Sequence, residues 1–456
     1  MAYAKALAER PGTAIPELFT RKYDIDATYD LLDQREVTPD AIQNCHRRLV
    51  KQELRQPGRY LLIEDTTFPS FTHRKRAVPG LGPIGGSEEG QQGFLLHSVL
   101  ALRAPLAAQP DARGRRPPVT ILGLIDQQYL VRSPRPVAKS KQAISRQRTE
   151  RDRESDRWLE SSRRIGSAPA DPDIRWVRVA DREADIYEYL CECLVRNQGF
   201  LVRVNQDRVI LDPESGRRLG LVFEHIAGVP PQGGMYLDLR ARDGHKTRRA
   251  QLLISCGPVR VRAPERPGIA AGTNEPIDCW FIRLWEPAPP EGVEALEWVL
   301  YSDERTETLE EALVGAMDYA TRFLIEEFHK GLKTGLKAEE LQLETGPRLF
   351  AAIAVMSVVA LRLLDLRELG RMAPEAAATV TGLSDLELEL LSLAVDRTLT
   401  TAASVLLALG RLGGHMNRRS DGMPGWITLW RGMKMLRLLV RGAELERMRN
   451  EKRVHT

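Results

Sequence analysis

The stretch Ile174-Arg-Trp-Val-Arg-Val-Ala-Asp181-Arg-Glu-Ala-Asp185-Ile-Tyr-Glu-Tyr189 decides the fold of this chain. Apolar residues alternate up to Ala180, which predicts a strand that stops at Asp181 and runs into a helix. Strands that alternate with crossover helices build α/β sheets. The sequence therefore predicts an α/β fold in which this strand presents a carboxylate at its end.

A second apolar run ends in the same way. Leu61-Leu-Ile-Glu-Asp65-Thr-Thr reads as a strand that delivers an aspartate at its polar end. Further strands are predicted at 95–102, 119–131 and 199–204, and the last of these follows the helix after Asp181. From Thr308 the pattern is helical to the end of the chain.

One of these helices carries a polar stripe. At 100° per residue, one helix face holds Tyr319, Arg322, Glu326, Lys330 and Lys333. The stripe places one carboxylate among four groups that suit phosphate. A solvated row of ion pairs is the competing interpretation for this segment alone.

Asp65, Asp181 and Glu326 together suggest a metal site. Carboxylates brought together from separate elements repel one another unless a cation lies between them, and Mg²⁺ prefers oxygen ligands. Two Mg²⁺ ions in such a site could activate an attacking oxygen and stabilise a leaving one. The alternative role for the two aspartates is helix capping, and we expect Glu183 and Asp185 to be first-turn helix residues.

Four blocks of the sequence carry a family resemblance. Glu64-Asp65-Thr66-Thr67, the segment 181–190, the helix 319–333 and the block 412–432 resemble the IS4-family cut-and-paste DNA transposases, and the similarity extends over nearly the whole chain. The resemblance implies a ribonuclease-H-like catalytic core. It also implies that Asp65, Asp181 and Glu326 form a DDE site for two Mg²⁺ ions, for which Mn²⁺ can substitute.

The resemblance assigns further residues to double-stranded DNA. Arg322, Lys330 and Lys333 would face phosphates around the scissile bond, Tyr319 would donate its hydroxyl, and Arg203 would face DNA. Trp298 would stack on a base flipped out beside the cut, although a tryptophan in such a run is usually a core residue. The implied reactions are nicking of the transposon end, hairpin formation and opening, and strand transfer into target DNA.

Composition neither forces nor excludes a nucleic-acid partner. The net charge of the 456 residues is only +4, but the segment 131–165 has 11 Lys or Arg against 5 Asp or Glu. A solvated charged loop is the default for such a segment, and a surface that tracks DNA is the alternative.

The chain is long enough for several domains. We expect a shortened N-terminal helical DNA-binding region at 1–58, a catalytic domain at 59–368 with a β-rich insertion at about 205–292, and a C-terminal helical domain at 369–456. The family implies that the C-terminal region forms the homodimer of the synaptic complex. The N-terminal region is shorter than the family pattern by about one helical unit, which in the family carries contacts to the element end.

Neither a membrane nor an oxidising compartment is indicated. Five unevenly spaced Cys fit a reducing cytosol. The most apolar run, 349–361, is too short to cross a bilayer and predicts a buried helix. We expect a protein of the bacterial cytoplasm, associated with the nucleoid.

Two other functions fit part of the sequence. A non-catalytic, transposase-derived regulatory dimer agrees with the short N-terminal region, and the three carboxylates oppose it. A metal-dependent nuclease that only hydrolyses DNA agrees with the carboxylates, but Trp298 and the Tyr319 stripe oppose it.

Overall fold

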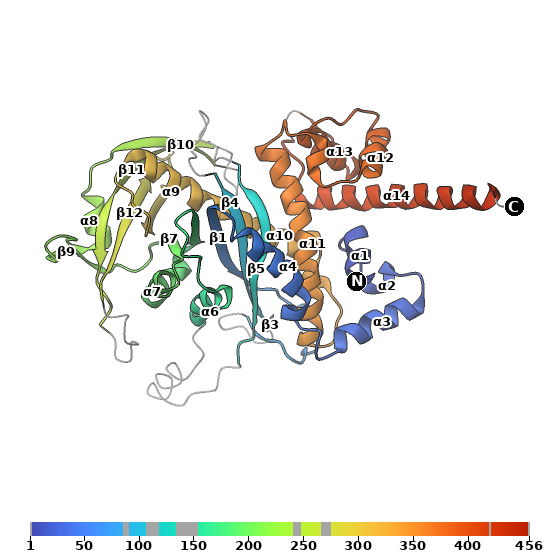
Figure 1. Cartoon of the computed structure of the whole chain (residues 1–456), viewed down its shortest axis with the longest axis horizontal. Helices are drawn as coiled ribbons and strands as arrows, with labels where there is room; N and C mark the ends of the chain where they lie inside the picture. The colour runs from blue at the N-terminus through green and yellow to red at the C-terminus, as the bar shows by residue number, and fades with distance from the viewer. Residues whose placement is uncertain are drawn as a thin grey trace.

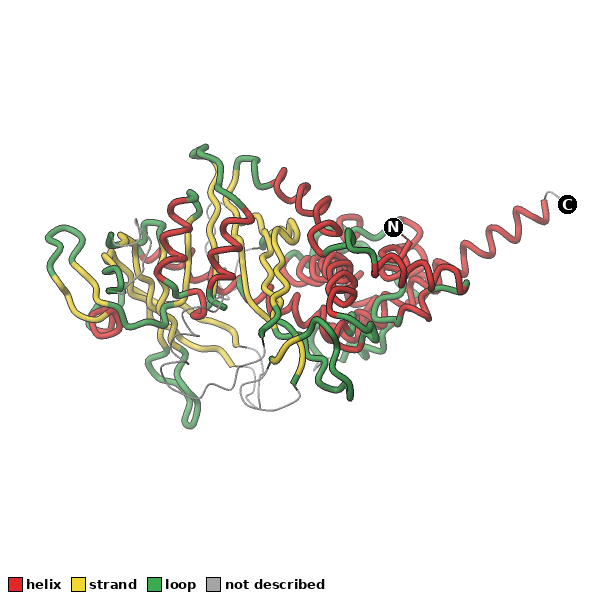
Figure 2. The backbone as a smooth tube through the Cα atoms, turned by 90° about the horizontal axis from the view of Figure 1, so that it is seen from below, coloured by secondary structure: helices red, strands yellow, loops and turns green. Residues whose placement is uncertain are grey.

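The structure is a computed structural model that describes residues 2–84, 91–105, 118–133, 154–239, 248–265, 275–418 and 421–454. One half of the molecule is built on a large mixed sheet and the other half is helical (Figure 1). The predicted α/β class is confirmed. Figure 2 shows the same division from below, with the strands gathered at one end of the molecule.

Five strands form the part of the sheet that positions the site. Their order is β5-β4-β1-β6-β7, with β1, β6 and β7 parallel and β4 antiparallel to both of its neighbours. The bounds are β1 Gly58–Thr67, β4 Leu95–Ala104, β5 Thr120–Leu130, β6 Ile174–Ala180 and β7 Gly199–Arg203. Each corresponds to a strand predicted from alternating apolar residues.

The predicted β-rich insertion continues this sheet. The order proceeds from β7 through β13, β12 and β11 to β8 and β9, and β10 pairs with β11. The bounds are β8 Val209–Leu211, β9 Arg218–Leu221, β10 Gly233–Leu239, β11 Arg248–Val261, β12 Ile277–Trp285 and β13 Glu297–Ser302. A separate short pair is formed by β2 Gly82–Pro83 and β3 Gln92–Gly93.

Helices cover both faces of the sheet. On one face lie α6 Asp156–Ile165, α7 Tyr187–Val195 and α8 Val222–Ala227, and on the other lie α9 Leu309–Thr321 and α10 Phe323–Lys330. A capping box at Thr308 and Glu311 begins α9, because each side chain satisfies a backbone N–H of the other residue. The three short 3₁₀ turns are η1 Arg182–Ala184, η3 Ala338–Glu340 and η4 Ala378–Thr381.

The N-terminal region is helical, as predicted. Its helices are α1 Ala2–Glu9, α2 Ile15–Leu18, α3 Lys22–Asp33 and α4 Pro39–Glu53. Thr38 caps α4 by accepting from the N–H of Ala41 at 3.2 Å. Helix α4 packs between β5 and α11 Gly346–Met372.

Helix α11 corrects one prediction. The apolar run 349–361 was predicted to be too short to cross a bilayer, but the helix that contains it has 27 residues and is long and apolar enough to do so by length and composition. Of its most apolar window, 67% is buried inside the protein. The prediction of a buried helix is confirmed.

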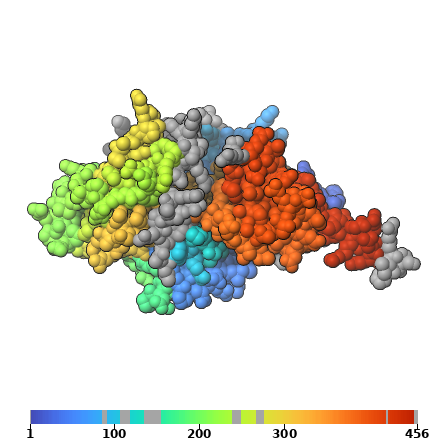
Figure 3. Space-filling model, turned by 90° about the horizontal axis from the view of Figure 1, so that it is seen from above, coloured from blue at the N-terminus to red at the C-terminus, as the bar shows by residue number. Residues whose placement is uncertain are grey.

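The chain ends with three helices, α12 Asp385–Val395, α13 Ala402–Leu412 and α14 Trp426–Val454. Helix α14 projects beyond the rest of the molecule, as Figures 1 and 3 show. Its first residue is anchored to α10, since Trp426 Nε1 donates to Glu327 Oε2 at 2.8 Å. Arg367 of α11 pairs with the same carboxylate and lies over the Trp426 ring, 4.9 Å from its centroid.

Candidate functional site

Asp65 and Asp181 occupy equivalent positions on adjacent parallel strands. Ile63 of β1 pairs with Val179 of β6, and each aspartate stands two residues further along the chain, Asp65 within β1 and Asp181 directly after the end of β6. Because side chains alternate along a strand, both carboxyl groups point to the face that carries α9 and α10. Asp181 also caps η1, accepting from the N–H of Glu183 at 2.9 Å, so the competing prediction of a cap is confirmed for this residue.

Glu326 approaches this face from α10, which packs against β1. Its carboxylate pairs with Arg322, and Arg322 Nη1 lies 3.6 Å from Asp65 Oδ2. The structure thus brings all three predicted carboxylates to one end of the sheet, with the Arg322 guanidinium in contact with two of them. The side chain of Asp65 retains only 19% of its exposure.

The electrostatics of Asp65 reflect this convergence. Burial raises the pKa of Asp65 to about 7, Asp181 and Glu326 add to the rise, and Arg322 and the Thr66 N–H oppose it. Asp65 is therefore a carboxyl group that gives up its proton reluctantly. A second positive charge near the group would favour its ionised form.

The donor set suits a hard divalent cation, because it consists of carboxylate oxygens that repel one another. Among the residues that the structure describes, however, His, Cys, Asp and Glu side chains do not gather in any group of three or more that could hold a metal ion. In this structure the positive charge beside Asp65 and Glu326 is the Arg322 guanidinium, which contacts both of them. Metal ligation by Asp65, Asp181 and Glu326 stays a prediction.

Four predicted DNA-contact residues lie together beside the carboxylates. The ring of Trp298 on β13 meets the Tyr319 ring edge-on, with centroids 5.1 Å apart. The Arg322 guanidinium lies 6.0 Å from the Tyr319 centroid. Arg203 ends β7 and donates to the carbonyl of Glu297 at 3.0 Å. Trp298 is partly exposed, whereas Tyr319 is only 5% exposed.

The two lysines predicted to contact DNA, Lys330 and Lys333, lie in different environments. The stripe was predicted on one continuous helix, but the helix turns at Arg322 and ends in the π-turn η2 Gly331–Gly335. Lys333, in this turn, donates to the carbonyl of Phe68 at 2.9 Å and lies 3.4 Å from Glu339. Lys330 is exposed.

Sequence reasoning missed a polar network behind the site. Thr66 Oγ1 accepts from Arg157 Nε at 2.8 Å and lies 3.0 Å from His97 Nδ1. His97 Nε2 lies 3.3 Å from Glu64 Oε2, and both side chains are fully buried. Arg178 and Tyr189 also bind Glu64. Burial alone would raise the pKa of Glu64, but the charges and hydrogen bonds of Arg178 and His97 together lower it to about 2. The available signal was the pair Glu64 and Arg178, charged residues at core positions of two predicted strands.

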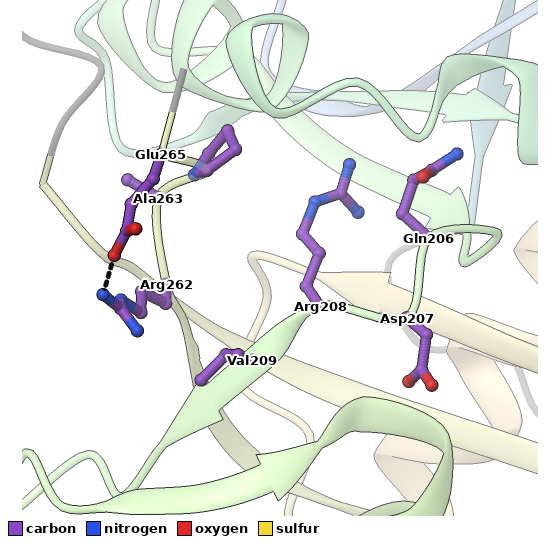
Figure 4. Close-up of a pocket in the computed structure, with 8 residues that line it drawn as sticks. Gln206, Asp207, Arg208, Val209, Arg262, Ala263 and Glu265 are labelled. Atoms are coloured by element: carbon purple, nitrogen blue, oxygen red, sulfur yellow. Dashed lines mark hydrogen bonds and ion pairs between the residues drawn. The ribbon is translucent and has the colours of Figure 1, made fainter. Parts of the chain in front are cut away.

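Asp185 also departs from its predicted role. It is not a first-turn residue of α7 but a buried acceptor for the N–H groups of Asn205 and Gln206, both at 2.6 Å. Arg208 pairs with it and lines a neighbouring pocket of about 380 Å³. Figure 4 shows this pocket between the segments 206–209 and 262–265, with Arg262 and Glu265 paired at its rim. It contains none of the predicted site residues.

Two other predicted features have different outcomes. Residues 134–153 of the basic segment lie outside the described residues, and its described parts are 131–133 and 154–165, which include α6. In α14, the apolar face of Trp426, Leu429, Trp430, Met433 and Leu436 is core, whereas Leu439 is 38% exposed.

No protein-family model matches the sequence.

Proposed function

We propose that this protein is a cut-and-paste DNA transposase with a DDE active site at Asp65, Asp181 and Glu326. The observation that carries the proposal is the placement of two aspartates at equivalent ends of adjacent parallel strands, with a glutamate reaching the same face from α10. The strand order β5-β4-β1-β6-β7 supports the ribonuclease-H-like core that the sequence resemblance implies.

The neighbouring cations and aromatic rings suit a DNA backbone. Arg322 offers a planar fork that can bind a phosphate with two parallel hydrogen bonds, and Lys333 adds a point charge from the π-turn. Tyr319 is buried, and the Arg322 guanidinium lies over its ring. Trp298, partly exposed beside Tyr319, offers a ring face or edge to an unstacked base.

Mg²⁺ is the cofactor that fits the donor set, with Asp65, Asp181 and Glu326 as its ligands. When bound, two Mg²⁺ ions would supply the positive charge that activates an attacking oxygen and stabilises the leaving oxygen. The chain itself positions these carboxylates, and its Arg322 and Lys333 side chains supply the positive charges that receive the phosphate. Arg322, which contacts Asp65 and Glu326, is then free to shift its hydrogen bonds towards DNA.

The test is cleavage of duplex DNA that ends in the inverted repeats flanking the gene, with Mg²⁺ or Mn²⁺ present. We predict that Asp65→Asn, Asp181→Asn and Glu326→Gln each reduce nicking by at least 10³-fold, on the order expected for loss of a metal ligand, while DNA binding persists. Glu310→Gln is the matched control, because Glu310 is exposed in the first turn of α9. A wild-type rate in any one of the three variants would remove that residue from the site.

A nuclease that only hydrolyses is the second candidate, since the same carboxylates would serve it. Trp298 separates the two functions, because hydrolysis of one strand needs no flipped base. Stacking on an aromatic ring returns roughly 1 to 3 kcal/mol per base. We therefore predict that Trp298→Ala nicks normally but forms hairpins about tenfold more slowly, and that an abasic site at the flipped position partly restores them. Nicking without any hairpin by the wild-type protein would favour the nuclease, and unchanged hairpin formation in Trp298→Ala would mean that Trp298 is a core residue.

A further inference from the structure

Arg157 of α6 contacts both of the strand ends that carry the proposed catalytic aspartates. Its Nε donates to Thr66 Oγ1 at 2.8 Å, and its Nη2 binds Glu183 Oε2 at 2.6 Å. Thr66 directly follows Asp65, and Glu183 lies two residues after Asp181. Arg157 is only 8% exposed, whereas the Glu183 side chain is 51% exposed, so the guanidinium reaches from a buried position to the edge of the site.

The two residues that Arg157 holds share a second property. The backbone N–H of Thr66 donates to Asp65 Oδ1 at 2.8 Å, and the N–H of Glu183 donates to Asp181 Oδ1 at 2.9 Å. Each aspartate is thus oriented by a residue whose side chain binds the same guanidinium. A planar fork with donors in fixed directions can connect two such groups, whereas a flexible ammonium cannot do so equally well.

Arg157 reaches the strand ends from behind the site. Thr66 points to the face opposite to Asp65, where His97 is its partner across β1 and β4. With His97 Nδ1 at 3.0 Å and Arg157 Nε at 2.8 Å, the threonine hydroxyl has two partners and one defined position. Glu326 and Arg322 lie on the opposite face of the sheet, where Arg322 contacts Asp65.

We propose that Arg157 is a positioning residue that fixes the separation of Asp65 and Asp181 and thereby sets the affinity of the site for divalent cations. The inference rests on the proposed function, because a shared cation is what makes this separation matter. Residues behind a metal site commonly tune its affinity by 10-fold to 100-fold through the orientation of the ligands.

The experiment measures Mn²⁺ binding to the full chain without DNA, by electron paramagnetic resonance of the free ion. Arg157→Gln and Arg157→Lys should both weaken binding at least tenfold, since neither can bridge Thr66 and Glu183. Arg163→Gln is the matched control, because Arg163 lies on the same helix and pairs with Glu192 near the surface. Thr66→Val should weaken binding as well, and Thr66→Ser should restore it.

Amide hydrogen exchange supplies a readout that needs no metal. Arg157→Gln should speed exchange at the Thr66 and Glu183 amides, and Arg163→Gln should not. If Arg157→Gln lowers the melting temperature but leaves Mn²⁺ affinity and these amides unchanged, Arg157 only supports the fold and the inference is overturned. If the wild-type chain itself binds no Mn²⁺ while the two amides still respond to Arg157→Gln, the failure lies in the proposed metal site.

Discussion

Folding raises the pKa of Asp65, so near neutral pH the folded protein keeps this carboxyl group protonated more than the unfolded chain does. Its pKa is raised to about 7, above the value near 4 of an aspartate in water. The folded protein therefore binds a proton that the unfolded chain releases between these pH values. Stability contributed by this proton is fully present below pH 4 and is lost as the pH rises through 7.

We predict that Asp65→Asn raises the free energy of unfolding at pH 8 by on the order of 1 to 3 kcal/mol in metal-free buffer. Asparagine cannot ionise, so it avoids the burial and repulsion that the carboxylate experiences. At pH 4 the two proteins should be nearly equal in stability. Urea unfolding at both pH values measures the difference, and equal stabilities at pH 8 would contradict the raised pKa.

For His329, folding lowers the pKa, so its effect on stability has the opposite dependence on pH. It is fully shielded on α10, and burial, together with Lys333, His97 and Arg322, lowers its pKa to about 3. The folded state keeps the ring neutral, so stability is present above the ordinary pKa near 6.5 and is lost as the pH falls towards 3. We predict that His329→Gln makes unfolding less sensitive to acid, by on the order of 2 kcal/mol between pH 7 and pH 5. The exposed His73, replaced by Gln, should leave the pH profile unchanged.

Individual site residues were predictable where a local pattern placed them. Asp65 and Asp181 stand at the ends of apolar strands, and Glu326 lies in a helical stripe with Arg322. Arg157 gave no such signal, because its role depends on where α6 lies after the long segment 134–153. The sequence also predicted Asp185 as a first-turn residue, and no local rule reveals that a loop 20 residues later folds back onto it.

At the scale of elements, the strands were predicted closely and the helix 319–333 was not. Its last part, the π-turn η2, packs against α14, which lies about a hundred residues further along the chain. Trp426 packs against Gly331, and Trp430 packs against Gly335. A π-turn accommodates the two indoles, and periodicity within the helix itself carries no information about them.

Gly335 provides a direct test of this packing. A Cβ at this position would lie 1.6 Å from Trp430 Nε1, and Trp430 is only 5% exposed. We predict that Gly335→Ala costs about 1 to 3 kcal/mol of stability through overpacking. Gly442→Ala, in the exposed part of α14 with open space around it, should instead add up to about 1 kcal/mol. Chemical denaturation of the two variants compares them, and a neutral Gly335→Ala would mean that the indole moves aside freely.

At the scale of the whole molecule, one buried cluster runs from the α10 face of the sheet through α11 to the base of α14. The sequence suggested three domains by composition, and their boundaries stay predictions. The insertion strands could not be predicted to extend the main sheet, because the pairing between β12 and β13 depends on edges that meet only in the folded chain.

The outer half of α14 is where the predicted dimer contact belongs. Leu438 is 50% exposed, and Leu445 and Met448 are each 51% exposed. We predict that Leu445→Glu with Met448→Glu leaves the melting temperature within about 1 °C, as for surface changes generally, and abolishes complexes that hold two DNA ends. Gel-shift and sedimentation measurements distinguish complexes that hold one DNA end from complexes that hold two. Paired-end complexes that survive these changes would place the contact elsewhere.

The anchoring of α14 links its projecting end to the neighbourhood of Glu326. Trp426, the first residue of the helix, lies between Arg367 and Glu327, and Glu327 is the direct neighbour of Glu326. The face from Trp426 to Leu436 is core, so the projecting arm is 437–454, which at 1.5 Å per residue is about 27 Å long. A partner bound to this arm would be connected, through the packed base of the helix, to the residue next to the proposed metal ligand.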